Sequence, residues 1–189
     1  MSYIIVRLQQ GGSEWLQWRS QGIGASDAPT IMGENPWKTP KDLLEEKCGW
    51  KKVPTNAAMA RGTALEPEAR KSYEARVGFP VVPACLQSGK FDWLRASLDG
   101  LAFDRSSAVE IKCGESVYRK ASANREVPSY YYGQLQHILA ITDLPSIAFY
   151  CYLPERPEVH LTVERNESYI KRLVDTEGLF WEEILKHRK

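Results

Sequence analysis

The spacing of apolar residues predicts helices on both sides of a block of strands. Recurrence every three or four residues predicts helices, and alternation or short β-branched runs predict strands. Helices are expected over 14–21, 27–32, 40–48, 64–77, 129–142 and 167–187. Strands are expected over 80–86, 91–98, 107–113, 146–153 and 158–164, with residues 102–107 as a hinge. This order predicts an α/β (α+β) fold, a central mixed sheet flanked by helices.

Local signals mark where several of these helices begin and end. Ser13, Ser26 and Thr39 each precede a helical pattern, where a side-chain oxygen can cap the first free N–H groups. Pro40 suits the first turn of a helix, and Gly78 suits a helix end. The apolar faces expected of the three longer helices are Leu65, Ala69, Tyr73 and Val77; Tyr131, Leu135, Ile138 and Leu139; and Ile170, Leu173, Val174, Trp181 and Ile184.

Composition refines this expectation. The 189 residues are 43% hydrophobic and show no repeat or linker, so one domain over residues 1–189 is expected. No apolar run is long enough for a membrane span, and the start lacks a signal-peptide pattern, which predicts a cytoplasmic protein. Four scattered cysteines without a CxxC motif indicate free thiols in or near the core. The net charge of +1 does not by itself indicate a nucleic-acid binder.

The stretch SLDGLAFDRSSAVEIKC, residues 97–113, places charges where the pattern predicts a core. A hairpin that pairs Asp104 with Ser107 sets Asp99 opposite Lys112. Side chains alternate along a strand, so Asp99, Glu110 and Lys112 share one face. Two neighbouring carboxylates repel each other unless one is protonated or a cation lies between them. Their oxygens and the Ile111 carbonyl suit Mg²⁺, and Lys112 could steady or help deprotonate a metal-bound water that attacks a phosphodiester.

An ordinary ion pair on an edge strand also explains Glu-x-Lys, and the spacing alone does not decide between the two interpretations. The same spacing occurs at Glu45 and Lys47, on an expected helix, where solvated side chains are the simplest interpretation.

Several further segments, taken in order, carry a resemblance. They are residues 15–49, RGTALEPEAR, ASLDGLAFD, VEIKCG and YYGQLQHILAIT. Together they resemble the YqaJ-like phage recombinase family, which includes the lambda exonuclease and belongs to the PD-(D/E)XK nuclease superfamily. The resemblance covers about residues 15–153 and implies a restriction-endonuclease-like core. Leu98 stands where the superfamily has proline, at a position that supplies no ligand.

The resemblance assigns roles residue by residue. It implies Asp99, Glu110, the Ile111 carbonyl and Glu66 as metal ligands, and Lys112 and Gln134 as further active-site residues. On geometry alone Glu66 could instead form a surface pair with Arg70. The resemblance also implies that a terminal 5′-phosphate is held by three residues, which are Arg19, Ser26 and Ser97. Without it, Ser26 is a helix cap and Arg19 a partner for a carboxylate on the first helix.

The implied function is Mg²⁺-dependent 5′→3′ digestion of linear double-stranded DNA, with Mn²⁺ as a substitute, leaving 3′ single strands for recombination. The resemblance further implies a toroidal homotrimer around the DNA and a partner protein that anneals single strands. A ring needs basic residues only on its inner wall, which is compatible with a net charge of +1. Trp37 is a candidate strand-separating wedge, with core packing as the alternative. Two other functions remain open: an endonuclease on the same fold, and a DNA-end-binding module without catalysis.

Overall fold

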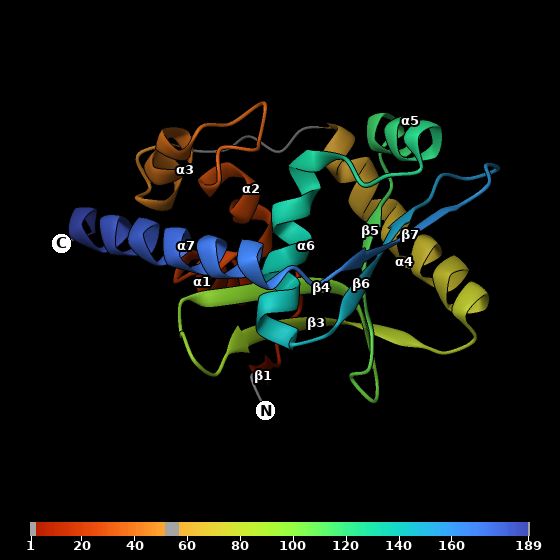
Figure 1. Cartoon of the computed structure of the whole chain (residues 1–189), viewed down its shortest axis with the longest axis horizontal. Helices are drawn as coiled ribbons and strands as arrows, with labels where there is room; N and C mark the ends of the chain where they lie inside the picture. The colour runs from red at the N-terminus through yellow and green to blue at the C-terminus, as the bar shows by residue number, and fades with distance from the viewer. Residues whose placement is uncertain (1–2, 52–56, 189) are drawn as a thin grey trace.

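A computed structural model describes residues 3–51 and 57–188, with the side chains of 57–59 left out. In chain order the longer elements are β1 (Tyr3–Val6), α1 (Ser13–Ser20), α3 (Pro40–Lys47), α4 (Ala57–Val77), β3 (Val81–Ser88), β4 (Leu94–Ala102), β5 (Ala108–Lys112), α5 (Glu115–Asn124), α6 (Ser129–Thr142), β6 (Ser146–Cys151), β7 (Val159–Glu164) and α7 (Glu167–His187). Between α1 and α3 lie β2 (Ile23–Gly24), the 3₁₀ turn η1 (Ala25–Asp27) and α2 (Ala28–Ile31) (Figure 1).

The strands form one mixed sheet in the order β1-β3-β4-β5-β6-β7. Neighbours are antiparallel except β5 and β6, which are parallel, and the short β2 pairs in parallel with β4. The expected mixed sheet with flanking helices is therefore confirmed. Among the described residues no helix is long and apolar enough to cross a membrane.

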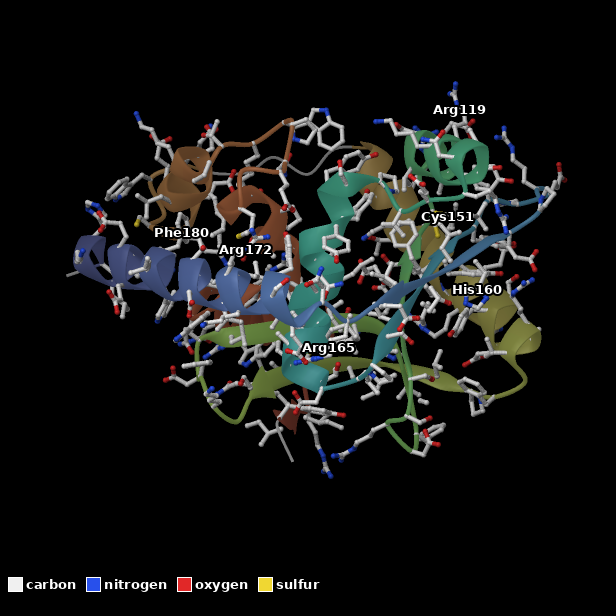
Figure 2. The ribbon with its side chains drawn as sticks, viewed as in Figure 1. Arg119, Cys151, His160, Arg165, Arg172 and Phe180 are labelled. Atoms are coloured by element: carbon white, nitrogen blue, oxygen red, sulfur yellow. The ribbon has the colours of Figure 1, made fainter. Side chains whose placement is uncertain are left out.

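Two apolar layers cover the two sides of this sheet. One contains Leu135, Ile138 and Leu139 of α6, and the other contains Ala69 and Tyr73 of α4. The first layer also includes Cys151, which lies inside the molecule, whereas Arg119 projects outward from α5 (Figure 2). The described part of the chain holds its four cysteines as free thiols. The central strands β4 and β5 thus lie between α6 and α4.

The helix patterns are reproduced most closely toward the C-terminus. Helices α6 and α7 begin and end where the pattern predicts, and Ile170, Leu173 and Ile184 of α7 are buried. Thr39 caps α3 by accepting a hydrogen bond from the Asp42 N–H, and Gly78 adopts a left-handed φ of 81°. Helix α4 begins at residue 57, seven residues before the expected 64. β1, β2 and α5 were not expected.

Two of the expected helix caps are wrong. Gly12 occupies the N-cap of α1, and Ser13 is its first helical residue. Ser26 lies inside η1, and Asp27 precedes the first residue of α2. The Asp27 carboxylate accepts a hydrogen bond from the Gly24 N–H at 2.9 Å, which tightens the turn and leaves the Ser26 hydroxyl free for another partner.

The β4–β5 hairpin also differs from the expected pairing. Gly100 pairs with Val109, and the Ala102 N–H bonds the Ser107 carbonyl, a register two residues away from the expected one. A left-handed Arg105, with φ of 63°, lies in the resulting turn, which is longer than the expected one. A shift by two residues preserves the face of every side chain, so the expected shared face survives the wrong register.

A β-bulge lies at Asp99 on β4. Val82 pairs with Leu101 and Ala84 with Leu98, so Asp99 and Gly100 together oppose the single residue Pro83. A Cβ on Gly100 would lie 2.6 Å from a Val81 methyl and 2.7 Å from a Val109 methyl, so a glycine is required here. Bulges re-aim side chains and interrupt pairing, and this one falls on a candidate site residue.

Candidate active site

Glu110 is the buried centre of the site, with 2% of its surface exposed. Its Oε1 atom accepts hydrogen bonds from Lys112 Nζ, in a short ion pair, and from Gln134 Nε2 at 2.6 Å. Gln134 comes from α6, which covers this face of β5. The other oxygen, Oε2, is buried without a hydrogen-bond partner among the described residues. A buried carboxylate oxygen left in this state is costly unless something binds it.

Asp99 approaches Glu110 from the bulge. Its Oδ2 atom accepts the Ile111 N–H at 2.7 Å, a bond in which the side chain replaces the backbone of β4. Its own carbonyl accepts Arg70 Nε, also at 2.7 Å, from α4. The bulge therefore turns the Asp99 carboxylate toward β5, and Arg70 fixes the peptide behind it.

The backbone carbonyl of Ile111 points toward the Asp99 carboxylate. The Lys112 carbonyl accepts the Tyr152 N–H, so the Lys112 carbonyl points toward β6. Backbone groups of successive residues in a strand point in opposite directions. The Ile111 carbonyl therefore points toward β4 and Asp99, as expected of a third oxygen ligand.

Electrostatics confirm that these carboxylates are crowded. Burial and the neighbouring Glu110 raise the pKa of Asp99 well above its ordinary value. Burial alone would lower the pKa of Lys112, but Glu110 and Asp99 hold it above its usual range. Lys112 is thus a firmly protonated cation, and the metal-free site favours a proton on Asp99.

Glu66 lies on α4 close enough to interact with both Lys112 and Glu110, and burial raises its pKa. Within residues 3–51 and 57–188, however, no three His, Cys, Asp or Glu side chains are arranged as a metal-ligand cluster. The oxygen donors that lie together are the carboxylates of Asp99 and Glu110 and the carbonyl of Ile111. These residues fit a hard divalent cation because the set is all oxygen, carries excess negative charge and includes the unpartnered Glu110 Oε2. Glu66 as a fourth ligand remains a prediction.

The three residues expected to hold a phosphate form a second group. Arg19 Nη2 donates to the Ser26 hydroxyl, and the Arg19 guanidinium stacks 5.0 Å above the Trp15 ring. Trp15 Nε1 in turn donates to Ser97 Oγ at 2.8 Å. Parallel pairing of β2 with β4 brings η1 beside the strand that carries Ser97. Trp15, which the sequence did not single out, thus links Arg19 to Ser97.

A buried ion pair supports the same turn. Asp27 and Lys47 lie 2.6 Å apart and are 9% and 10% exposed in their side chains. The solvated Lys47 expected from the sequence is wrong, because Lys47 also donates to the Gly22 carbonyl and ties α3 to the turn. The charges of Lys47 and Arg19 hold the pKa of Asp27 below its ordinary value, although burial alone would raise it.

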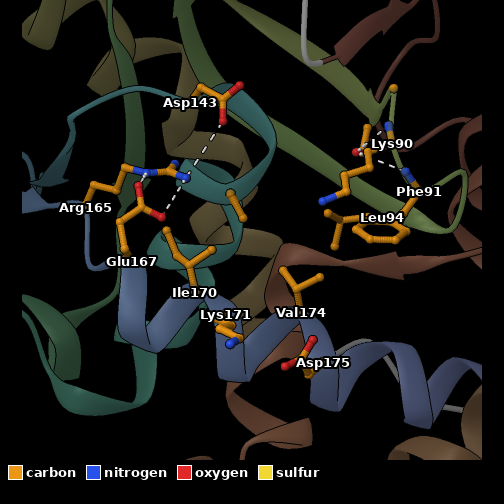
Figure 3. A pocket seen from close by; sticks show the side chains of 13 residues that line it. Lys90, Phe91, Leu94, Asp143, Arg165, Glu167, Ile170, Lys171, Val174 and Asp175 are labelled. Carbon is orange, nitrogen blue, oxygen red and sulfur yellow. Dashed lines mark hydrogen bonds and ion pairs between the residues drawn. The ribbon is translucent and has the colours of Figure 1, made fainter.

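A pocket of about 710 Å³ lies away from these residues, between the β3–β4 turn and the ends of α6 and α7 (Figure 3). Its Arg165 is already engaged by Glu167, and it lies 3.8 Å from Asp143. None of the expected site residues lines this pocket.

The fold and the site together define a class. The fold is the mixed sheet with flanking helices that the resemblance implied, and it brings Asp99, Glu110, Lys112 and Gln134 together. Residues 14–145 match the YqaJ-like viral recombinase domain, and the chain belongs to this family.

Individual relatives agree with this placement. The chain is 30% identical over 176 residues to YqaJ of Bacillus subtilis, and 25% identical over 161 residues to a protein of Acanthamoeba polyphaga mimivirus. The matches cover 89% and 77% of this chain but only 54% and 29% of those proteins, so the chain spans about half the length of the first.

Two solved structures share the fold. LHK-Exo, an alkaline exonuclease from Laribacter hongkongensis solved also with dAMP, superposes with a TM-score of 0.82 at 24% identity, over 94% of both chains. A phage-related exonuclease from Haemophilus somnus gives a TM-score of 0.63 at 14% identity, over 89% of this chain and 96% of that one.

Proposed function

We propose that the protein is a Mg²⁺-dependent exonuclease that degrades one strand of linear double-stranded DNA from its 5′ end, leaving 3′ single strands for recombination by annealing. The observation that carries the proposal is the buried Glu110, with one unpartnered oxygen beside the carboxylate of Asp99. An ordinary ion pair needs one carboxylate for one ammonium. The second carboxylate accepts the Ile111 N–H, but its negative charge beside Glu110 is unfavourable unless a further cation is bound.

In this proposal Asp99, Glu110 and the Ile111 carbonyl hold Mg²⁺, with Glu66 completing the set directly or through water. The ion would supply a water nucleophile at neutral pH and a positive charge for the phosphate. Lys112, protonated and paired with Glu110, places a fixed cation where negative charge develops on the phosphodiester. Gln134 keeps the Glu110 side chain in position.

Arg19, Ser26 and Ser97 would hold the terminal 5′-phosphate. Arginine offers a planar fork of N–H donors to phosphate oxygens, and the two hydroxyls add neutral donors. The contacts through Trp15 place these groups near one another without a substrate. Each cut would expose a new 5′-phosphate, which the same pocket could bind.

Family membership supports a role in recombination, and the dAMP bound to LHK-Exo is a nucleoside monophosphate, the class of product that an exonuclease releases. By the same relationship we propose a homotrimeric ring, a single-strand annealing protein as partner, action in the cytoplasm and Mn²⁺ as an alternative ion.

The deciding experiment compares end-labelled linear duplex with closed circular duplex, each incubated with Mg²⁺ and then with a chelator. Degradation of the linear DNA alone, abolished by the chelator, is expected. Cutting of the circle would favour an endonuclease. Binding of ends without cutting in Mg²⁺ would favour the non-catalytic module.

The phosphate pocket is tested on linear duplexes that differ only in a 5′-phosphate or 5′-hydroxyl. Wild type should degrade the phosphorylated end about tenfold faster or more, since a charge-assisted contact to phosphate is lost on the other end. Arg19→Ala should lose most of that preference, whereas Arg7→Ala, which removes an arginine outside the group, should keep it. Equal initial rates on both ends in the wild type would refute the pocket.

A further inference from the structure

Three consecutive tyrosines lie in the first turn of α6, and each faces a different part of the molecule. Successive residues of a helix point about 100° apart. Tyr130 has its ring centroid 4.7 Å from that of Trp37, which is 70% exposed, so the core packing considered for Trp37 is wrong. Tyr132 packs on Tyr169 of α7, with centroids 4.9 Å apart. Tyr131 faces the candidate active site.

The Tyr131 ring is packed on the apolar core and carries a cation over its face. Its centroid lies 5.6 Å from that of Phe149, which is completely buried. Phe149 pairs with Glu110 in the ladder between β5 and β6. Lys112 Nζ lies over the Tyr131 ring, 4.9 Å from its centroid. The core therefore fixes an aromatic face beside the Glu110–Lys112 pair.

Helix α6 contacts both members of that pair. Residues three apart on a helix share a face, which lets Gln134 donate to Glu110 while Tyr131 lies under Lys112. A lysine has a flexible four-carbon stem, so its ammonium needs contacts to stay in one place. Glu110 supplies one such contact, but its Oε1 is shared with Gln134, and under the proposed function Glu110 also binds Mg²⁺. The Tyr131 ring holds Lys112 without engaging this carboxylate.

We propose that Tyr131 is a positioning residue, whose ring face attracts the Lys112 ammonium and holds it at the reacting phosphodiester. The face of an aromatic ring attracts a cation most strongly where water is partly excluded, and Lys112 keeps only 20% of its side chain exposed. The inference rests on the proposed nuclease function, because it concerns the place of Lys112 during cleavage. The ring, rather than the hydroxyl, is the group that acts.

The first measurement needs neither DNA nor metal. NMR of protein with ¹³C-labelled lysines, in a chelator, reports the ε-methylene group of Lys112, which is assigned by its disappearance in Lys112→Met. An aromatic ring shields the nuclei that lie over its face. The Lys112 signal should therefore move downfield in Tyr131→Leu and stay near its wild-type position in Tyr131→Phe.

Cleavage assays measure the consequence for the reaction. Tyr131→Leu should lower the single-turnover rate at saturating Mg²⁺ about tenfold, the size expected of a partly shielded cation–aromatic contact. Tyr131→Phe should stay within about twofold of wild type because the ring face remains. In the Lys112→Met background, Tyr131→Leu should lower the rate no further, since a residue that acts through Lys112 has nothing left to hold.

Two further variants separate this attraction from packing. Trifluorophenylalanine at position 131 keeps the shape of the ring but weakens its negative face, so the rate should fall about threefold or more below that of Tyr131→Phe at an unchanged melting temperature. Tyr132→Leu is the matched control, because Tyr132 is the next residue of α6, is partly buried and packs on Tyr169. It should lower the melting temperature and leave the rate per folded molecule unchanged.

The proposal is overturned if the Lys112 signal stays in place in Tyr131→Leu, or if that variant loses the same factor in rate with and without Lys112. Should Tyr131→Leu fail to fold, equal rates for phenylalanine and trifluorophenylalanine at position 131 would overturn it as well. A wild type that cuts no DNA refutes the nuclease proposal instead, and the NMR comparison still decides whether Tyr131 holds Lys112.

Discussion

Two buried acid–base pairs in this protein look alike but have different surroundings. Glu110 pairs with Lys112, and Glu177 pairs with His137 at 2.7 Å. Each glutamate has one oxygen, Oε2, that lacks a hydrogen-bond partner among the described residues. By the usual criterion of a buried polar group without a partner, both would be candidate sites.

Access and charge balance separate them. His137 and Glu177 are completely buried, and the His137 Nε2–H donates to the Arg95 carbonyl at 2.9 Å. Their charged neighbours Asp27 and Lys47 form a pair of their own, so this region is balanced. Around Glu110, by contrast, Asp99 and Glu66 add carboxylates, and Lys112 keeps 20% of its side chain exposed. Excess negative charge together with access distinguishes a binding site from a structural ion pair.

Removing the excess negative charge at Asp99 should lower the cleavage rate more than any other change. Asp99→Asn keeps the shape and can still accept the Ile111 N–H, but it supplies no anionic ligand. Cleavage should fall to background. Because burial and Glu110 raise the pKa of Asp99, its ionisation costs stability as pH rises, so the metal-free variant should melt at a higher temperature than wild type at pH 8.

The measurements are single-turnover cleavage and thermal unfolding in a chelator. Asp104→Asn, in the exposed turn of the same hairpin, serves as the control and should cut normally. A near-wild-type rate for Asp99→Asn would show that the cluster is not the catalytic site.

Lys112→Met should have the second largest effect. It removes the cation and keeps most of the side-chain length, so the rate at saturating Mg²⁺ should fall by about 10²- to 10⁴-fold, the usual range for such a group. Mg²⁺ affinity, measured by calorimetry, should be unchanged or slightly tighter because a neighbouring positive charge is lost. A loss of less than fivefold would reassign Lys112 to a structural ion pair.

The buried pair of His137 and Glu177 should affect the free energy of unfolding and leave the cleavage rate unchanged. Glu177 and its hydrogen bond raise the pKa of His137, although burial alone would lower it. The stability from this proton is therefore complete below the ordinary histidine pKa of about 6.5 and is lost as pH rises through the folded value.

Glu177→Gln should cost about 1–3 kcal/mol at pH 6 and less at pH 9, since its main loss is the charged hydrogen bond. Thermal melts across this pH range check the slope, and kcat per folded molecule should match wild type. A constant difference between the two proteins at all pH values would mean that His137 is not the titrating group.

The sequence predicted the outer helices better than the central hairpin. Helix α7 has Asn166 as its cap, with the side chain accepting the Tyr169 N–H, and a clear apolar face, so its bounds followed from local signals. Helix α5 begins at Glu115, and its N-cap Gly114 offers no side-chain cap. Of the four residues in β1, only Tyr3 is buried. Neither has a strong local pattern.

Within the site, alternation was enough to bring Asp99, Glu110 and Lys112 to one face. The bulge was missed, although Pro83 in one strand and Gly100 in its neighbour are both residues that favour interrupted pairing. The contact of Trp15 with Ser97 joins residues 82 positions apart, and no local pattern reports it. The sequence therefore shows which chemical groups are present, and tertiary contacts determine how their side chains are oriented.

The strand β4 carries both halves of the proposed site. Ser97 and Asp99 are both partly exposed, with the fully buried Leu98 between them. Strand geometry puts such neighbours about 6.6 Å apart, since each residue advances about 3.3 Å. Consecutive phosphates of an extended nucleic-acid strand have a similar separation. Under the proposed function, a terminal phosphate bound at Ser97 would place the next phosphodiester at Asp99. The spacing of these two residues would then make the enzyme remove one nucleotide at each step.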